Sequence, residues 1–406
     1  EDTARVFKEA FYIAGTGRPG PVLIDIPMDV QKSVIDFEYP EKCEIRSYKP
    51  TTKGNYVQVR RVMAALEEAE KPLICIGGGV FAAHAENEIR ELADLMQIPV
   101  ITTMMGISVF PDDDQLFCGM IGTHGVKMAN AAVNECDVLF LVGARVGDRA
   151  VKTPLALEKT TKIIHIDIDP AEIGKNIGAD LPLVGDAKLV LQQMMELAKP
   201  MKHDEWIAHI KTLGGERKYV EPAKGTVNPR VFIDRLAKKM PANVTVVADV
   251  GQNQIWTCTE YKFRKEGRLL TSGGMGTMGY SVPAAIGAKM ADDSRATVAI
   301  CGDGAFQMSF MELATAVQFG VDIKVVVMTN NRLGMVRELQ TNGYHDRQTA
   351  VFLDGSPDFI KLAEAYGIPA MRVYDDDTME KGIEMLAEHK GICLVEVVVD
   401  KDMPTL

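Results

Sequence analysis

An aspartate between two glycines follows one of the most apolar runs of the chain. Gly302-Asp303-Gly304 comes directly after Thr297-Val-Ala-Ile-Cys301. A further apolar run, 325–329, begins 22 residues after Asp303 and is followed by Asn330-Asn331. Polar residues at the ends of buried strands lie where open α/β sheets bind ligands. Asp303, Asn330 and a nearby backbone carbonyl would give Mg²⁺ the oxygen ligands it prefers, with diphosphate oxygens and water completing an octahedron. The alternative is an aspartate that only caps the following helix.

A second group of glycines, Gly77-Gly78-Gly79, follows the apolar run Pro72–Ile76. Glycines after a strand allow close approach to a dinucleotide phosphate, but the GxGxxG spacing of the usual fingerprint is absent. A tight turn between a strand and a helix explains these three glycines equally well.

Clusters of glycine and polar residues that follow apolar runs are typical of parallel sheets, whose strands end at a common edge. Apolar runs alternate with helical patterns, which predicts an α/β protein with two doubly wound parallel sheet domains. The first domain is expected at 54–197, with strands at 72–76, 100–101, 138–142 and 163–168. The second is expected at 227–406, with strands at 244–248, 296–301, 323–328 and 394–399. Linkers are predicted at 31–53 and 198–226.

The first thirty residues predict a helix at 4–14 and a strand at 21–27. One helix and one strand cannot form a domain, because a lone strand has nothing to pair with. Residues 1–30 are therefore interpreted as the last part of a further sheet domain. The chain begins Glu1-Asp2-Thr3 without a methionine, which supports the interpretation that it is a piece of a longer protein.

Composition argues against several classes of function. The 406 residues include 45 Lys and Arg against 56 Asp and Glu, and a net charge of −11 argues against a nucleic-acid or anionic-membrane surface. No uninterrupted apolar stretch approaches the 18 residues or so that a membrane helix needs. Seven cysteines without CxxC spacing indicate a reducing cytoplasm rather than a disulfide framework.

The diphosphate-type motif gives the chain a resemblance to a known family. Gly302-Asp303-Gly304 with Asn330-Asn331 resembles the motif of thiamine-diphosphate enzymes. Among these the chain is similar to the catalytic subunit of acetohydroxyacid synthase (acetolactate synthase). The similar segments are 17–27, 143–145, 165–173, 272–287, 311–316 and 333–337. Leu333-Gly-Met-Val-Arg337 favours the synthase branch over related carboligases, decarboxylases and oxidases, such as glyoxylate carboligase or pyruvate oxidase.

This resemblance implies roles for individual residues. Asp303 and Asn330 would bind Mg²⁺ through their side chains, and Arg332 through its carbonyl. The residues expected to contact thiamine diphosphate are Gln252, Asn253, Gly276, Met278, Gly304 and Ala305. Asn253 stands where the family commonly has His, and both side chains can donate to phosphate. Met278, a candidate catalytic residue, would be the apolar wedge that bends the cofactor so that proton removal becomes intramolecular.

The resemblance also implies FAD in a structural role, because the net reaction moves no electrons. The residues expected to hold it are Gly77, Gly78, Gly79, Ile121, Gly122, Thr123, His124, Gly143, Ala144, Arg145, Asp167, Ile168, Asp186 and Ala187. Taken alone, His124 would more often be a structural histidine. Asp169, before Pro170, is expected to cap a following helix.

The implied reaction decarboxylates pyruvate on thiamine diphosphate and joins the remaining two-carbon unit to a second 2-keto acid. The product is 2-acetolactate, or 2-aceto-2-hydroxybutyrate from 2-ketobutyrate, in branched-chain amino acid biosynthesis. Arg149 matches the family arginine that receives the carboxylate of the second substrate, although a solvated surface arginine is the alternative. The family usually has Asp-Asp-Arg where this chain has Gly147-Asp148-Arg149. Leu339 stands where many members carry a Trp that favours 2-ketobutyrate, which leaves acceptor preference open.

Family members place the site between two subunits, so a homodimer or tetramer is implied, and a small regulatory subunit is a candidate partner. The glutamate that starts the reaction in the family belongs to the amino-terminal domain and is assigned to no residue here. The 406-residue chain alone is therefore expected to be inactive. A flavin oxidoreductase and a non-catalytic binding module remain alternatives, and the latter would leave Asp303 and Asn330 without a role.

Overall fold

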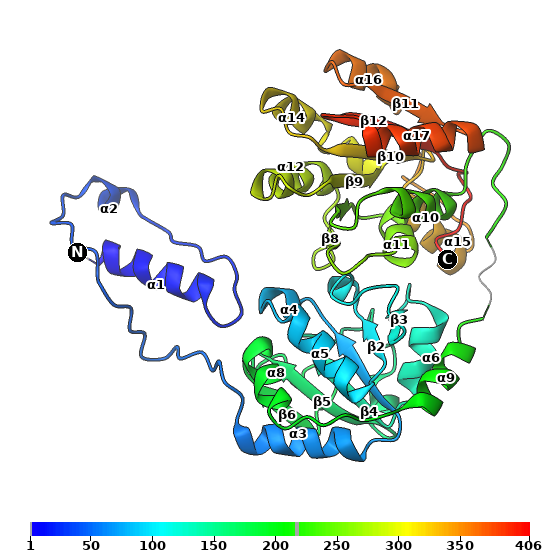
Figure 1. Ribbon diagram of the computed structural model, residues 1–406. Helices are drawn as coiled ribbons and strands as arrows, with labels where there is room; N and C mark the ends of the chain where they lie inside the picture. The colour runs from blue at the N-terminus through cyan, green and yellow to red at the C-terminus, as the bar shows by residue number, and fades with distance from the viewer. Residues whose placement is uncertain (1, 216–218) are drawn as a thin grey trace. The chain divides into compact units, whose positions relative to one another are not determined.

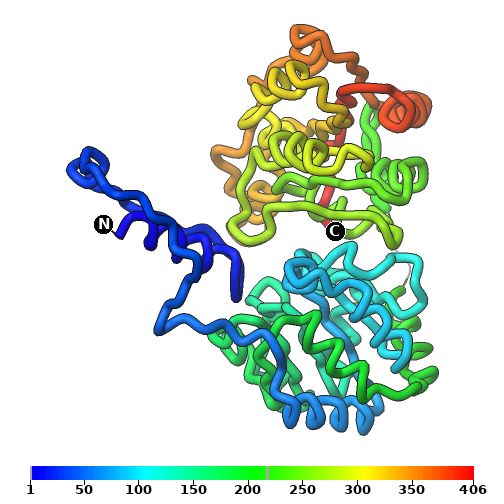
Figure 2. Tube along the Cα trace, turned by 60° about the vertical axis from the view of Figure 1, so that its left-hand side comes forward, coloured from blue at the N-terminus to red at the C-terminus, as the bar shows by residue number. Residues whose placement is uncertain are grey.

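The computed structural model describes residues 2–215 and 219–406, whose strands form two six-stranded sheets (Figure 1). The chain begins with helices α1 (Thr3–Gly15) and α2 (Met28–Lys32) and then runs irregularly to α3 (Tyr56–Glu68) (Figure 2). The helix expected at 4–14 is confirmed as α1. The strand predicted at 21–27 is wrong, because this stretch has no regular secondary structure and pairs with no described strand, and an unpaired strand has no ladder to stabilise it.

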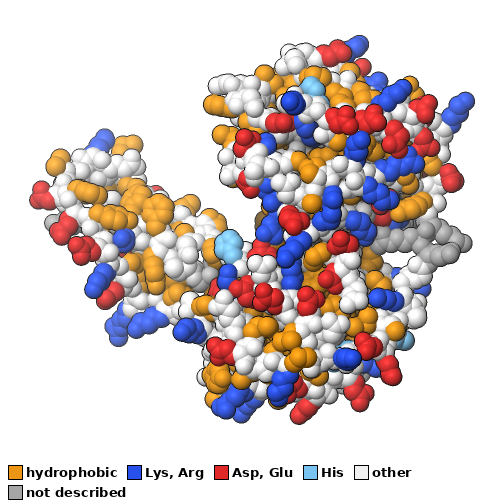
Figure 3. All heavy atoms as spheres, viewed as in Figure 1, with side chains coloured by type: hydrophobic (Ala, Val, Ile, Leu, Met, Phe, Trp, Pro, Cys, Tyr) orange, Lys and Arg blue, Asp and Glu red, His pale blue; other side chains and the backbone are white. Residues whose placement is uncertain are grey.

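The amino-terminal segment buries little of its own apolar surface, and Figure 3 shows apolar side chains gathered on it. Phe11 is 71% exposed, Leu23 89% and Val34 99%. Helix α1 has a single buried residue, Ala4. The two sheets, in contrast, each bury continuous apolar strands.

The first sheet has the strand order β3-β2-β1-β4-β5-β6, and its described strand pairings are parallel. Its strands are β1 (Pro72–Ile76), β2 (Val100–Thr102), β3 (Phe117–Met120), β4 (Val138–Val142), β5 (Lys162–Asp167) and β6 (Leu181–Val184). The central strands β1 and β4 are buried along their whole length, as expected where helices cover both faces of a parallel sheet. The helical elements from 79 to 195 are α4 (Gly79–Ala82), α5 (Glu86–Met96), η1 (Met104–Gly106), α6 (Lys127–Glu135), α7 (Pro154–Leu157) and α8 (Ala187–Met195).

The second sheet has the order β11-β12-β10-β9-β7-β8, with all pairings parallel. Its strands are β7 (Thr245–Ala248), β8 (Arg268–Thr271), β9 (Thr297–Gly302), β10 (Lys324–Thr329), β11 (Ala370–Val373) and β12 (Cys393–Val398). The helical elements from 204 onward are α9 (Asp204–Thr212), α10 (Pro229–Lys239), α11 (Gln252–Glu260), α12 (Ser281–Ala291), α13 (Asp303–Phe306), η2 (Phe310–Glu312), α14 (Leu313–Gln318), α15 (Gly334–Gly343), α16 (Phe359–Ala365) and α17 (Asp376–Glu388).

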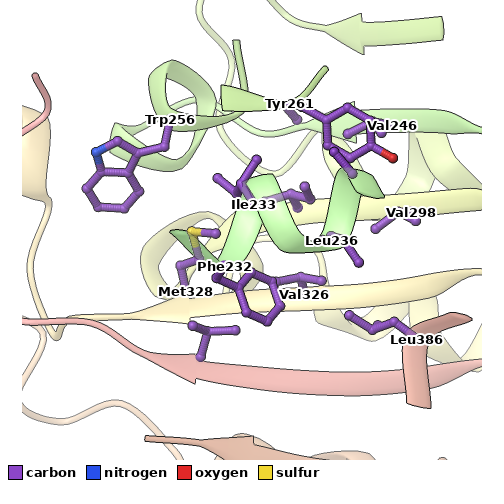
Figure 4. Close-up of a cluster of buried hydrophobic side chains, with 14 of the residues drawn as sticks. Phe232, Ile233, Leu236, Val246, Trp256, Tyr261, Val298, Val326, Met328 and Leu386 are labelled. Atoms are coloured by element: carbon purple, nitrogen blue, oxygen red, sulfur yellow. The ribbon is translucent and has the colours of Figure 1, made fainter. Parts of the chain in front are cut away.

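Helices cover both faces of this second sheet. Residues of α10, α11 and α17 pack on one face, where Phe232, Trp256 and Leu386 meet alternate residues of the strands (Figure 4). Residues of α12, α14 and α16 pack on the other face against the intervening strand positions. The doubly wound α/β class predicted from the sequence is therefore confirmed.

Four strands were not expected from the sequence: β3, β6, β8 and β11. Each is an edge strand of its sheet and is only partly buried, so it lacks a continuous apolar run. The stretch 198–226, expected to be a linker, contains helix α9. None of the described helices combines the length and apolarity that a membrane span requires.

Asp112 gives a prediction for stability. Its side chain is 10% exposed and its Oδ2 accepts from the Phe263 N–H at 2.8 Å, but burial raises the pKa of Asp112 to about 6. The folded state thus holds this proton more tightly than the unfolded state does, and the stabilising contribution of the protonated carboxyl is lost as pH rises from about 4 to 6. Asp112→Asn should remove this decline, which amounts to at most about 3 kcal/mol.

Chemical unfolding of the two proteins at a series of pH values measures this difference. Asp293→Asn, which changes a side chain that is 92% exposed, is the control and should follow the parent protein. Parallel pH profiles for Asp112→Asn and the parent would contradict the prediction.

Candidate cofactor and metal site

The candidate metal ligands lie at the carboxyl ends of two adjacent strands. Asp303 follows β9 and opens α13, whereas Asn330 follows β10. The strands pair in parallel, with Gly302 opposite Met328, so both groups reach the same edge of the sheet. The loops after β7 and β8, the next strands in the sheet, carry Gln252 and Met278 to this edge.

The Asp303 carboxylate is buried, with 2% of the residue exposed, and its described hydrogen-bond partners are backbone N–H groups. Oδ2 accepts from Asn331 N at 2.6 Å and from Asn330 N at 3.2 Å, and Oδ1 accepts from Gly304 N at 2.8 Å. Asn331 has φ +55°, and this left-handed residue turns successive N–H groups toward the carboxylate. Burial raises the pKa of Asp303 to about 6, although the N–H donors oppose the rise. A bound hard cation would favour the ionised carboxylate, which burial disfavours.

Asn330 and Arg332 complete the candidate oxygen set. Asn330 Oδ1 accepts from Arg332 N at 3.1 Å. The Arg332 guanidinium donates to Asn331 O at 2.7 Å and to Asp354 Oδ1 at 2.8 Å, and it lies over the Phe352 ring. These contacts occupy the Arg332 side chain, so only its carbonyl is suited to a metal. A carboxylate, an amide oxygen and a carbonyl are the donor types that fit Mg²⁺.

Two of the residues expected to contact the diphosphate, Gln252 and Asn253, lie in the first turn of α11, and their side chains are bound within the protein. Asn253 Nδ2 donates to Asp249 O at 2.8 Å and to Ile300 O at 3.3 Å. Gln252 Nε2 donates to Met403 O at 2.9 Å. Backbone N–H groups in the first turn of a helix have no partner within the helix and favour anions. The α11 backbone is therefore the part of these residues best suited to a diphosphate.

Asp249, directly after β7, was not predicted as a site residue, but it holds the loop that carries Met278. It is 0% exposed, and its carboxylate accepts from Gly279 N at 3.1 Å and from Ser281 N at 2.7 Å. Met278 lies immediately before these two donors and is partly buried. Its Cε is near enough to Gly304 that a Cβ added there would lie 3.4 Å away. An acidic residue directly after a buried apolar strand was the available sequence signal.

Of three other predicted site residues, two are exposed and one is buried. Gly276 is exposed in the turn before Met278, with φ +68°. Ala305 is 1% exposed and packs into the core beneath α13. Arg149 is exposed in the turn 148–150 that follows β4.

The residues expected to hold FAD follow the strands of the first sheet. Gly77–Gly79 follow β1, Ile121–His124 follow β3, Gly143–Arg145 follow β4, Asp167–Ile168 end β5, and Asp186–Ala187 follow β6. Gly77 and Gly79 touch the backbone of Gly143, which has φ +56°, and a Cβ at Gly77 would overlap the Gly143 carbonyl oxygen. Close approach to the Gly143 backbone thus already explains Gly77 and Gly79. Asp186 caps α8 by accepting from Leu189 N at 3.1 Å.

A buried acidic group lies at the end of β5. Burial raises the pKa of Asp167, whose Oδ2 lies 4.0 Å from His165 Nε2. Both residues are buried, and burial lowers the pKa of His165. Asp169 Oδ1 accepts from Ala171 N at 3.0 Å, but the helix expected after it is wrong. Residues 170–175 form turns, so Asp169 caps a turn.

Comparison with known proteins places both sheets in one enzyme class. Residues 249–397 match the family described as thiamine pyrophosphate enzyme, C-terminal TPP binding domain. Residues 59–194 match the thiamine pyrophosphate enzyme central domain. The chain is therefore built of two domains of thiamine pyrophosphate enzymes, and the Asp303–Asn330 site lies within the TPP binding domain.

Full-length relatives narrow the class. The chain is 41% identical to the probable acetolactate synthase large subunit of Methanocaldococcus jannaschii, over 98% of this chain and 70% of that protein. It is 38% identical to the acetolactate synthase large subunit of Buchnera aphidicola, over 94% of this chain and 68% of that protein. It is 35% identical to acetolactate synthase isozyme 3 large subunit of Escherichia coli, over 98% of this chain and 72% of that protein. The chain belongs to the acetolactate synthase large subunit family.

Proposed function

We propose that the protein decarboxylates pyruvate and condenses the two-carbon unit with a second 2-keto acid, giving 2-acetolactate or, from 2-ketobutyrate, 2-aceto-2-hydroxybutyrate. The observation that carries this proposal is the buried Asp303 carboxylate beside Asn330 at the edge of a TPP binding domain. Thiamine diphosphate, when bound, supplies the carbon nucleophile and the electron sink for decarboxylation.

The residues of this chain would hold and orient the cofactor. Asp303, Asn330 and the Arg332 carbonyl would bind Mg²⁺, which neutralises the diphosphate. The first turn of α11 would donate N–H groups to the same anion. Met278, on the loop fixed by Asp249, would set the cofactor's bend. Arg149 would bind the carboxylate of the second keto acid through its guanidinium fork.

The remaining assignments are part of the same proposal. FAD would be held structurally at the carboxyl edge of the first sheet, with the phosphates near the β1 turn, where Gly78 precedes α4. A small regulatory subunit is a proposed partner, since the relatives are named large subunits. The protein itself would form a homodimer or tetramer. The seven cysteines are free thiols, which supports a cytoplasmic location.

A product assay on the full-length protein tests the function. Pyruvate with thiamine diphosphate and Mg²⁺ should give 2-acetolactate, and added 2-ketobutyrate should give 2-aceto-2-hydroxybutyrate. Acetate, acetaldehyde or acetyl phosphate as the main product would instead place the protein with the related decarboxylases and oxidases.

Leu339 gives a prediction for acceptor selectivity. It lies on α15 and is 61% exposed, so it offers little apolar wall to an acceptor. Leu339→Trp should raise the preference for 2-ketobutyrate over pyruvate about tenfold, since one methylene in an apolar pocket is worth ~1 kcal/mol or more. Competition between the two acceptors measures the ratio. Val336→Trp, an exposed position on the same helix, is the control, and equal ratios in the two variants would refute the role of position 339.

A further inference from the structure

Two side-chain amides form a chain of hydrogen bonds that ends at the candidate metal ligand. Gln252 Nε2 donates to Met403 O at 2.9 Å, and Gln252 Oε1 accepts from Asn330 Nδ2 at 3.2 Å. Asn330 Oδ1 in turn accepts from Arg332 N at 3.1 Å. This series of hydrogen bonds thus joins the carboxyl-terminal segment to the loop after β10.

The groups at the two ends of this series of hydrogen bonds fix the orientation of both amides. The Met403 carbonyl can only accept, so the side of Gln252 that faces it must be the NH₂ group. The Arg332 backbone N–H can only donate, so the side of Asn330 that faces it must be the oxygen. Turning either amide over would oppose two acceptors at one end or two donors at the other.

The carboxyl-terminal segment holds Gln252 firmly in this orientation. Gln252 is 4% exposed, and its Nε2 also donates to Thr405 Oγ1 at 3.2 Å. Thr405 Oγ1 donates to the Glu338 carboxylate, which also accepts from Thr405 N at 3.3 Å. Figure 1 shows the carboxyl terminus beside α15, the helix that carries Glu338. A Cβ at Gly334 would overlap Gln252 Oε1, so the packing around this oxygen is tight.

We propose that Gln252 is a positioning residue that fixes the amide of Asn330 so that its oxygen, and not its NH₂ group, faces the divalent cation. This inference rests on the proposed function, because it presupposes the Mg²⁺–diphosphate site. It gives the Gln252 side chain a different task from the diphosphate contact that the family resemblance implies. Without Gln252 the Arg332 N–H alone would oppose turning of the Asn330 amide, so the NH₂ group would face the cation more often and metal affinity would fall.

A metal titration on the full-length protein tests this role. Mn²⁺, which suits the same oxygen ligands, is titrated in the presence of thiamine diphosphate, and free Mn²⁺ is followed by electron paramagnetic resonance. Gln252→Met keeps the side-chain length and removes both the amide oxygen and the NH₂ group. It should weaken Mn²⁺ binding 10- to 100-fold, the usual effect of losing a group that orients a metal ligand.

Gln254→Met is the matched control for the loss of a buried glutamine. Gln254 lies on the same helix, is 5% exposed and donates to Thr271 Oγ1 at 2.6 Å, away from Asn330. This variant should bind Mn²⁺ within about twofold of the parent protein. An equal loss of Mn²⁺ affinity in the two variants would overturn the inference, because it would show that removing any buried amide from α11 weakens metal binding.

Asn330→Asp separates orientation from direct contact with the diphosphate. An aspartate presents an oxygen whichever way it turns, and Gln252 Oε1 would then face another acceptor, so Gln252→Met in the Asn330→Asp background should leave Mn²⁺ affinity unchanged or raise it. The full 10- to 100-fold loss in both backgrounds would refute a positioning role. If the parent protein bound neither Mn²⁺ nor thiamine diphosphate, the proposed function would fall and this inference with it. Normal binding by both the parent and Gln252→Met would overturn the inference alone.

Discussion

Asp303→Ala should weaken binding of Mg²⁺ and thiamine diphosphate by about 100-fold or more, equivalent to about 2.7 kcal/mol. The variant removes the one carboxylate among the three proposed metal ligands, and the remaining amide and carbonyl oxygens carry no formal charge. Isothermal titration of the full-length protein with the cofactor and metal measures the change. Asp293→Ala, which removes a side chain that is 92% exposed, should bind as the parent does.

Asp303→Asn separates loss of charge from loss of structure. The asparagine is nearly isosteric and can still accept from a backbone N–H, but it lacks the negative charge. Because burial raises the pKa of Asp303, the ionised carboxylate opposes folding above pH 6. Both of its oxygens accept from backbone N–H groups, so the NH₂ group of the asparagine must face a donor, and these two opposing effects should leave the cofactor-free variant within about 2 kcal/mol of the parent. Thermal unfolding without cofactor checks this. Cofactor affinity equal to that of the parent in either variant would refute the metal assignment.

Gly77→Ala should lower the free energy of unfolding by about 3 kcal/mol or more, at the upper end of the usual cost of overpacking. The added methyl group would overlap the Gly143 carbonyl oxygen, and both residues directly follow strands that pair along their whole length. Backbone at the ends of paired strands cannot move aside as a flexible side chain can. For a domain of this size the loss corresponds to a fall in the unfolding midpoint of roughly 6–12 °C.

Gly147→Ala is the matched control for Gly77→Ala. A Cβ at Gly147 would have no atom within 4 Å, and the residue lies in the same loop that follows β4. This variant should unfold within about 2 °C of the parent protein. Equal midpoints for the two alanine variants would show that the two loops can separate at little cost.

Most of the fold could be predicted because the central strands are buried on both faces. Strands such as β1, β4 and β10 are continuous apolar runs, and the sequence bounds them to within one or two residues. The four strands that were not predicted are the four edges, which are only four residues long and only partly buried. A run that short is not distinguished from an irregular loop by its pattern.

The site could be predicted only where strand ends carry it. Asp303 and Asn330 could be predicted because each follows a continuous apolar run, and parallel pairing brings the ends of such strands together. The role of Asp249 depends on which N–H groups face it, and no spacing rule encodes that. The contacts of Gln252 with Met403 and Thr405 join residues about 150 positions apart, and a single sequence contains no signal for them.

The left-handed backbone at Asn331 limits which residues that position can accept. Its side chain is exposed, yet φ of +55° is costly for residues other than glycine, asparagine and aspartate, and most costly for β-branched ones. A saturation library at position 331 should therefore yield few functional substitutions even though the side chain is exposed. In a set of homologous sequences such a position would appear as restricted as a metal ligand, and the restriction would come from a single dihedral angle.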